Sequence, residues 1–228
     1  MTYLKKLEVD FVVVPLHRLS HVLPSMDGLE RLCCSQPILF GPEDINISNM
    51  TQLTGLRLNY GKLQIPFGSF TGLVELDLYL HTRIDLGDGL SSMPLLESVR
   101  VAGLQQSCLE NVSALRTLRW LKSLTLDIPV DVGGDYFPAL GSLPELTFLK
   151  FLCARNTCSV SSLQQISLLN NLRALDCRQV ECVEPLDYLL DGCLPRLRWL
   201  SIPGTFDSTE TAKELRRRLP CLNRISGA

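Results

Sequence analysis

Aliphatic residues recur along the chain in the arrangement L-x-x-L-x-L, in which another apolar residue or a cysteine sometimes takes one of the fixed places. The fourth and sixth places alternate with the period of two that a strand with one buried face requires. Each copy therefore predicts a short strand, and the last copy is only partial. The copies follow one another at intervals of 20 to 26 residues, and their first places are Leu4, Leu29, Leu53, Leu73, Leu96, Leu121, Leu146, Leu172, Leu197 and Leu222.

The segments between the copies carry helix and turn signals. Several end in an apolar residue and a proline, as in Met93-Pro94. Proline stops a helix and favours extended geometry in the residue before it, so these pairs mark the approach to a strand. Thr211 and Glu214 show the spacing of a helix capping box. Short helices are predicted near 16–22, 112–119, 162–169, 185–191 and 209–218, and the short turn 59–72 is predicted to be irregular.

This pattern resembles the leucine-rich repeat, and the resemblance covers essentially the whole chain. It implies an α/β fold, a right-handed solenoid or horseshoe with a parallel sheet on its concave side and short helices or loops on its convex side. The sequence accommodates about nine to ten repeats of 20–26 residues. We expect residues 1–228 to form a single domain of this kind.

One turn alone buries too little apolar surface to offset the conformational entropy that it loses on folding. Stacked turns share that surface, which leaves the two ends of the stack to be covered. The sequence opens inside a repeat at Met1 and stops three residues after Ile225, without a polar or disulfide-bearing cap. We therefore expect the chain to be part of a larger protein and to pack against its other domains.

The ninth place of each copy distinguishes subtypes of this repeat, because many members carry asparagine or cysteine there. This chain carries neither, which is unlike the secreted receptors and the cysteine-containing F-box proteins. The remaining pattern resembles the irregular repeats of intracellular NLR immune receptors, especially those of plants. The ninth places are Val12, Pro37, Gly61, His81, Leu104, Pro129, Ala154, Val180 and Thr205.

Composition narrows the classes of function. Leucine accounts for 46 of the 228 residues, and the net charge is −2 with a pI near 5.9. A basic nucleic-acid-binding protein or a polybasic membrane-surface protein does not fit these values. No apolar run approaches the roughly 20 residues of a membrane span. The start of the chain lacks the features of a secretory signal, since Glu8 and Asp10 follow its two lysines.

The nine cysteines are irregularly spaced and contain no C-x-x-C pair. They fit reduced thiols that serve as small apolar side chains, which predicts a cytoplasmic protein. Three Asn-x-Ser/Thr triplets, at Asn46, Asn49 and Asn111, leave an extracellular glycoprotein open as an alternative. Chance matches in a chain rich in serine and threonine are the simpler interpretation.

The sequence contains no set of residues typical of an enzyme. His17 and His21 have a spacing that could hold a metal on a helix, with Cys33 and Cys34 as conceivable partners. This is a non-standard arrangement for zinc, and two surface histidines are the simpler interpretation. No phosphate-binding loop occurs, and Arg216–Arg218 fits a solvated helix face. We predict no catalytic residues, no metal and no cofactor.

The resemblance implies that ligands bind on the concave sheet, where the third, fifth and seventh places point outward. Arg57, Asp77 and Arg100 occupy the fifth place of successive strands and are expected to form a charge ladder. Phe148, Leu152 and Trp199 are candidates for one apolar patch. The full set of predicted partner-binding residues is Arg57, Tyr60, Asp77, Tyr79, Arg100, Phe148, Lys150, Leu152, Asp176, Arg178 and Trp199.

These features favour a non-catalytic protein–protein recognition module whose partner lies on the concave face, without nucleic acid or membrane. The NLR resemblance suggests ligand sensing in intracellular immunity or signalling. One alternative is the substrate-recognition part of an F-box-type ubiquitin-ligase subunit, although this chain lacks an adaptor-binding helical domain. The other alternative is the extracellular glycoprotein.

Overall fold

The computed structural model describes residues 4–9, 22–38, 50–60, 67–80, 87–103, 112–130, 136–153, 165–177, 194–202 and 209–226. Within these ranges, ten strands form one parallel sheet in chain order, so each strand pairs with the strand of the next turn. The strands are β1 (Lys6–Val9), β2 (Arg31–Ile38), β3 (Gly55–Tyr60), β4 (Glu75–Leu80), β5 (Ser98–Gly103), β6 (Ser123–Val130), β7 (Phe148–Cys153), β8 (Ala174–Asp176), β9 (Trp199–Ser201) and β10 (Arg224–Ser226).

Every copy of the sequence pattern coincides with one of these strands, as predicted. The alternation is clearest in the middle of the stack, where the fourth and sixth places, such as Leu124 and Leu126, are fully buried and the residue between them is partly exposed. Neighbouring strands pair with equivalent places opposite each other, as Leu124 on β6 does with Leu149 on β7. The repeat period therefore sets the register of the sheet up to the sixth place, and the register shifts beyond it between β2 and β3 and between β6 and β7.

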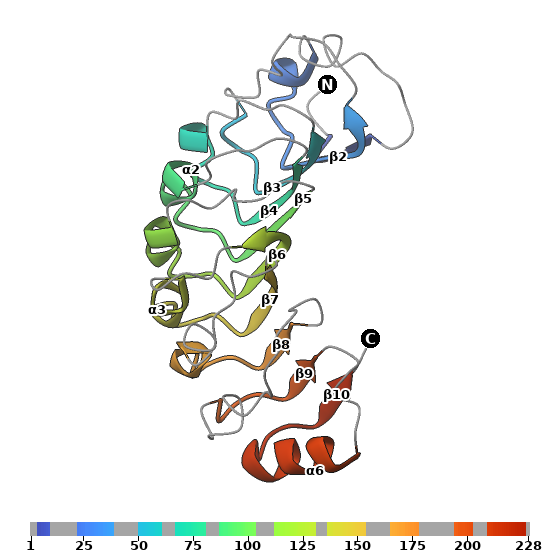
Figure 1. The fold of residues 1–228 in the computed structure, drawn as a ribbon. Coiled ribbons are helices and arrows are strands. Elements are labelled where there is room, and N and C mark those ends of the chain that lie inside the picture. The colour runs from blue at the N-terminus through green and yellow to red at the C-terminus, as the bar shows by residue number, and fades with distance from the viewer. Residues whose placement is uncertain are drawn as a thin grey trace.

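Short helices lie on the side opposite the strands, and Figure 1 shows the turns stacked in an arc with the strands on its inner side. The predicted helix at 209–218 is confirmed. The predictions near 112–119 and 162–169 hold as 3-10 helices, while 16–21 and 185–191 lie outside the described residues. The helices are η1 (Leu23–Ser25), η2 (Phe67–Ser69), α2 (Gly87–Ser91), η3 (Val112–Thr117), α3 (Tyr136–Gly141), η4 (Gln165–Leu168) and α6 (Thr209–Arg218).

The turn 59–72, predicted to be irregular, is partly regular. β3 continues to Tyr60, and η2 occupies Phe67–Ser69. Residues 61–66 lie outside the described ranges. The interval of 20 residues leaves room for a single 3-10 turn between the strands.

A tight turn precedes the strands and explains the proline positions. The amide of Leu96 donates to the carbonyl of Met93 at 3.3 Å, and the same bond recurs between Leu121 and Leu118 at 3.0 Å. Pro94 is the second of the four residues in the turn Met93–Leu96, where the fixed φ of proline is favourable. The proline therefore shapes the turn itself, and the strand begins a few residues later than the proline alone would suggest.

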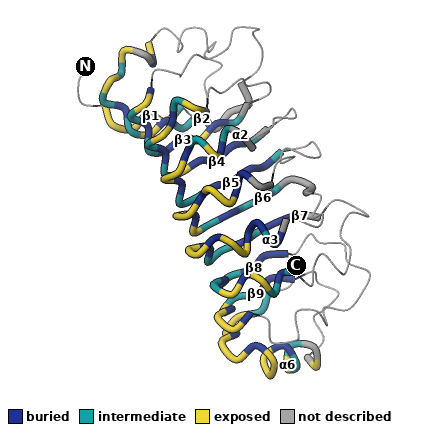
Figure 2. The backbone as a smooth tube through the Cα atoms, turned by 90° about the vertical axis from the view of Figure 1, so that its left-hand side faces the viewer, coloured by how far each residue is buried: buried dark blue, intermediate teal, exposed yellow. Residues whose placement is uncertain are grey.

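Backbone hydrogen bonds join the turns along the edge of the sheet at which the strands begin, here called the start edge. The carbonyl of Glu97 accepts amide hydrogen bonds from both Lys122 and Ser123, at 2.8 and 3.1 Å, and the equivalent pair of bonds recurs from turn to turn. Figure 2 shows the exposed turns of this edge in a row. These bonds connect successive turns in a chain that lacks an asparagine at the ninth place.

One continuous apolar core runs through the stack. It consists mainly of leucine, with a few larger side chains at the centre. Phe137 on α3 and Phe151 on β7 are both fully buried, and their rings meet edge to face with centroids 5.8 Å apart. This contact ties the helix side of a turn to its strand side.

Helix α6 carries a compact charge cluster. Glu214 accepts hydrogen bonds from Arg217 and Arg218, at 2.7 and 2.6 Å. These bonds lower the pKa of Glu214 from the usual 4.5 to about 2. The contribution of this carboxylate to stability is therefore present above pH 4.5 and is lost as the pH falls through about 2.

A carbon-detected NMR titration of Glu214 is expected to show a midpoint at about 2 in the native chain. Arg217→Ala combined with Arg218→Ala removes both donors and should return the midpoint to the ordinary glutamate range. Arg216→Ala is the control, since its exposed side chain forms no ion pair in the described structure. An unchanged midpoint in the double variant would show that the two arginines do not lower this pKa.

Candidate binding surface on the strand face

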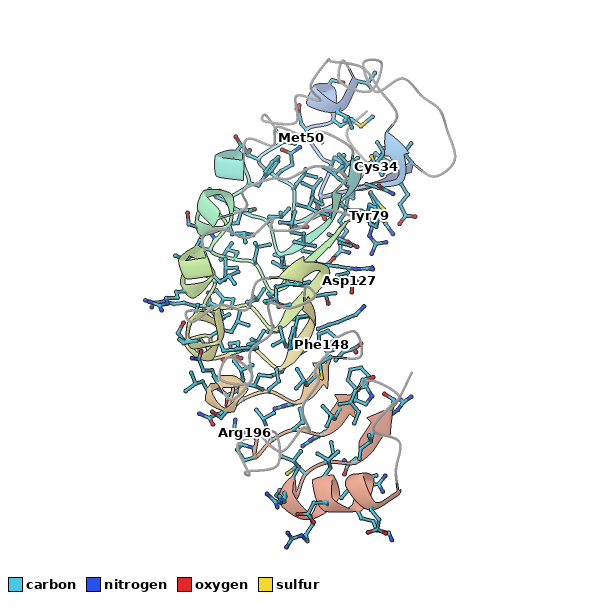
Figure 3. All side chains as sticks on the ribbon, in the orientation of Figure 1. Cys34, Met50, Tyr79, Asp127, Phe148 and Arg196 are labelled. Atoms are coloured by element: carbon cyan, nitrogen blue, oxygen red, sulfur yellow. The ribbon has the colours of Figure 1, made fainter. Side chains whose placement is uncertain are left out.

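The outward side chains of the sheet form one surface, here called the strand face. It consists of the third, fifth and seventh places of the repeat, which point away from the core. Figure 3 shows Tyr79, Asp127 and Phe148 along this inner side of the arc. The strand face is charged over the middle strands and aromatic toward the C-terminal end.

Arg57 and Asp77 form an ion pair on the charged part of this face. They are opposite each other on β3 and β4, and Arg57 Nε donates to Asp77 Oδ2 at 2.7 Å. The negative charge of Asp77 raises the pKa of Arg57 above its usual value, so the guanidinium stays charged. The contact between neighbouring strands that the sequence predicted here is confirmed.

Arg100 departs from the predicted ladder. It lies opposite Asp77 in the register but its Nη2 donates to Asp127 Oδ2 on β6, at 3.1 Å. Asp127 also pairs with Lys150 on β7, so one carboxylate joins two cations from the strands on either side. The predicted residue set missed Asp127. Asp127 occupies the seventh place of its repeat, opposite Ala102 on β5. This place points outward, so the sequence alone could have identified Asp127 as a candidate.

A second pair spans two strands and was also missed. Arg31 Nη2 on β2 donates to Glu75 Oε1 on β4, at 3.1 Å. Gly55 of β3 lies between them, and a Cβ atom there would come within 3.1 Å of Arg31 Cγ. A small residue in the middle strand therefore lets the arginine side chain cross it.

The same arrangement produces an aromatic pair. Phe148 on β7 and Trp199 on β9 occupy the third place on either side of Ala174 in the register. Strands two apart are separated by roughly 9.6 Å, yet the rings stack with centroids 6.2 Å apart and planes 10° from parallel. Ala174 leaves the space into which both rings lean. Both side chains remain partly exposed, so the pair forms a flat apolar surface on the strand face.

Asp176 does not lie where the sequence placed it. We expected an exposed fifth-place carboxylate, but the residue is only 3% exposed and is engaged within the chain. Its neighbour Ser201 is fully buried, and Ser226 Oγ lies 3.0 Å from Ser201 Oγ. Hydrogen bonding of this kind makes polar burial tolerable. The fifth place is therefore at least partly exposed from β3 to β7 and buried on β8 and β9.

The remaining predicted residues are placed only in part. Tyr79 lies between Asn59 and Ala102 in the register, is half-buried, and is engaged within the chain. Arg178 and the side chains of Tyr60 and Leu152 lie outside what the structure describes. The binding role of every residue in the set stays a prediction.

The strand-face ion pairs are expected to contribute little to folding. Asp127→Ala should lower the free energy of unfolding by about 1 kcal/mol, because Arg100 is half exposed and ion pairs that solvent reaches are screened and entropically costly. Urea unfolding at low salt and in 1 M NaCl measures this, and high salt should remove the difference. Glu145→Ala is the control, since Glu145 is exposed and forms no ion pair within the described ranges. A loss near 3 kcal/mol would make Asp127 part of the scaffold.

The described residues form neither a metal-binding cluster nor a membrane-spanning helix. No three histidine, cysteine, aspartate or glutamate side chains gather there in a group able to hold a metal ion. The candidate ligands His17 and His21 lie outside those ranges. No helix in the described part of the chain is long and apolar enough to span a bilayer.

Solved structures share this architecture. An internalin, InlF, from Listeria monocytogenes is similar with a TM-score of 0.63 and 20% identity, over 90% of this chain and 56% of its own chain. The leucine-rich-repeat-containing protein LegL7 from Legionella pneumophila is similar with a TM-score of 0.52 and 14% identity, over 100% and 90% of the two chains. The chain has a leucine-rich-repeat fold. The likeness at these identities concerns the fold alone.

This leucine-rich-repeat chain spans little more than half the length of the Listeria internalin chain. No protein-family model and no curated protein matches its sequence. The resemblance to leucine-rich repeats is thus supported by three-dimensional structure, while the resemblance to NLR receptors stays a prediction.

Proposed function

We propose that this chain is a non-catalytic recognition module that binds a protein partner on its strand face. The stacked pair of Phe148 and Trp199 carries this proposal. Aromatic side chains with one accessible face are enriched among the residues that dominate protein–protein binding energy. Here they stand on a rigid sheet, and Lys150 lies on the same strand as Phe148 and can supply polar contacts at the rim of the pair.

Each repeat separates the residues that form the core from those that face solvent, and this supports the proposal. From β2 to β9 the first, fourth and sixth places are apolar and buried, so these residues form the scaffold. The places between them hold arginine, aspartate, threonine, phenylalanine and tryptophan, and these can vary without altering the core. An array of this kind presents an extended surface whose chemistry is independent of its fold.

An intracellular role in immunity or signalling is our extension of this proposal. It rests on the irregular ninth place and on the thiols. Cys33, Cys34, Cys177 and Cys221 form no disulfide, which suits a reducing compartment.

Affinity capture with three versions of the chain tests the surface. The baits are the native chain, Phe148→Ala combined with Trp199→Ala, and Leu95→Ala combined with Trp120→Ala. The last pair is the control, since Leu95 and Trp120 are exposed apolar residues in turns before β5 and β6. We expect the strand-face variant to lose partners that both other baits retain. Identical partners on all three baits would overturn the assignment to Phe148 and Trp199.

A further inference from the structure

Arginines gather on the start edge of the last turns. Arg173, Arg196 and Arg198, here called the arginine edge, are all exposed and belong to the turns that lead into β8 and β9. We propose that the arginine edge binds an acidic segment of the protein partner, while the neighbouring aromatic pair takes up an apolar side chain of the same partner. The proposal deepens the proposed function and rests on it.

The charges on this edge differ from those on earlier turns. Upstream, cations at the second place of the repeat are neutralised by the next or preceding turn. Lys5 pairs with Glu30 and Lys122 pairs with Glu97, each at 2.8 Å. These pairs show that adjacent second places are close enough for side chains of opposite charge to meet.

Arg173 and Arg198 occupy the same second place but carry the same charge. The amide of Arg198 donates to the carbonyl of Arg173 at 2.8 Å, so the two residues are direct neighbours across the turns. Neither forms a side-chain ion pair within the described structure. Adjacent like charges destabilise a sheet, so this pair disfavours the free chain and would be relieved by an anionic ligand.

Arg196 is held in place without being neutralised. Its Nη1 donates to Asn171 Oδ1 at 2.8 Å, and Asn171 Nδ2 in turn donates to the carbonyl of Pro144 at 2.8 Å. The partner is therefore a neutral amide that is itself fixed to the backbone. This arrangement restricts the guanidinium and keeps its positive charge, which lowers the entropy cost of binding a carboxylate.

The arginine edge continues directly into the aromatic pair. Arg198 precedes Trp199 in the sequence, and Trp199 is opposite Arg224 on β10. Arg224 is exposed, and its side chain forms no ion pair in the part of the chain that the structure describes. A segment that passes from the edge onto the strand face therefore meets arginines first and then the stacked rings.

Charge elsewhere on the chain favours a short acidic segment over a long polyanion. Glu30, Glu97 and Glu145 lie on the same start edge, and the chain as a whole carries a net charge of −2. Nucleic acid that followed the edge would meet these carboxylates and would gain attractive contacts only at the last turns. An acidic peptide needs to cover only those turns.

Fluorescence anisotropy with defined probes tests the proposal. The first probe is a labelled peptide of glutamates with one central tryptophan. The second probe has glutamine in place of glutamate, and the third is a single-stranded thymidine oligonucleotide of equal length. The variants are Arg173→Glu with Arg198→Glu, and the matched control Arg116→Glu with Arg119→Glu. Arg116 and Arg119 are exposed on η3 and on the turn after it, so both variants change the net charge equally.

We expect the glutamate probe to bind the native chain at least about tenfold more tightly than the glutamine probe. Reversal at Arg173 and Arg198 should weaken it at least about tenfold, and the control should change it less than about twofold. Equal affinity for both peptides, or an equal loss in the two variants, would overturn the proposal. Tighter binding of the oligonucleotide would overturn it in favour of nucleic acid.

The Phe148→Ala and Trp199→Ala double variant separates this inference from the proposed function. If it keeps all captured partners while the arginine reversals still abolish probe binding, the strand-face assignment fails and the arginine edge stands. If it loses those partners while the arginine reversals leave probe binding unchanged, the arginine edge fails and the strand face stands.

Discussion

Phe151→Ala is expected to lower the free energy of unfolding by about 3–5 kcal/mol, because it removes a fully buried ring and leaves a cavity. The ring also meets Phe137 of α3 edge to face at 5.8 Å, and that contact is lost as well. β7 lies near the middle of the stack, with β6 on one side and β8 on the other. The damage should therefore weaken the packing of both neighbouring turns.

Urea unfolding followed by circular dichroism measures the loss, and amide hydrogen exchange locates it. Exchange should accelerate first in β6, β7 and β8, since each repeat is stabilised mainly by its neighbours. Thr125→Ala is the control because Thr125 lies on the strand face of β6 and outside the apolar core. A loss below about 1 kcal/mol for Phe151→Ala would mean that the core does not depend on this ring.

Gly141→Ala is expected to lower the free energy of unfolding by about 1–3 kcal/mol through overpacking. Gly141 ends α3 against η4, and an added Cβ would lie 2.9 Å from Leu168 Cβ and 3.3 Å from the Leu168 carbonyl oxygen. The Leu168 side chain is partly exposed, but its backbone cannot move without displacing η4. Thermal unfolding measures the shift, and hydrogen exchange of the amides at Leu169 and Leu172 shows whether η4 moves.

Gly68→Ala is the matched control for Gly141→Ala. It also places a methyl group on a glycine in a short helix, but apart from its chain neighbours and its own helix backbone no atom lies within 4 Å of the new Cβ. We expect no loss and a gain of at most about 1 kcal/mol, since alanine restricts the unfolded chain. Equal destabilisation by the two substitutions would show that the contact with Leu168 is not the cause.

The sheet could be predicted from the sequence because its determinants are local and periodic. One strand can be predicted from three leucines alone, Leu121, Leu124 and Leu126. The same spacing recurs in every turn. Helix α6 could be predicted as well, since it is ten residues long, but it begins at Thr209, two residues before the Thr211 of the expected capping box. Helices α2 and α3 span only five and six residues, which is too short for a helical period to show in the sequence.

The strand face could be predicted only in outline. Register alone placed Arg57 opposite Asp77, and the pair formed. Arg100 also lies opposite Asp77, but its side chain binds Asp127 instead. An arginine side chain is long enough to contact carboxylates at several positions of the neighbouring strands, so the register alone does not identify its partner. The ring pair of Phe148 and Trp199 forms because the small residue Ala174 lies between them. Aligning the third places of the repeats shows this order of large, small and large residues, from which the pair could have been predicted.

Site-specific photocrosslinking tests most directly whether the strand face binds a protein. A p-benzoylphenylalanine replaces Thr125, which lies on the strand face of β6 between Arg100 and Lys150 in the register. A second version carries the same photoreactive residue in place of Arg116, which is exposed on η3 on the helix side. We predict that irradiation in cells joins the Thr125 version to a discrete protein partner and that the Arg116 version gives no such product. A product from the Arg116 version alone, or from neither version, would contradict the account.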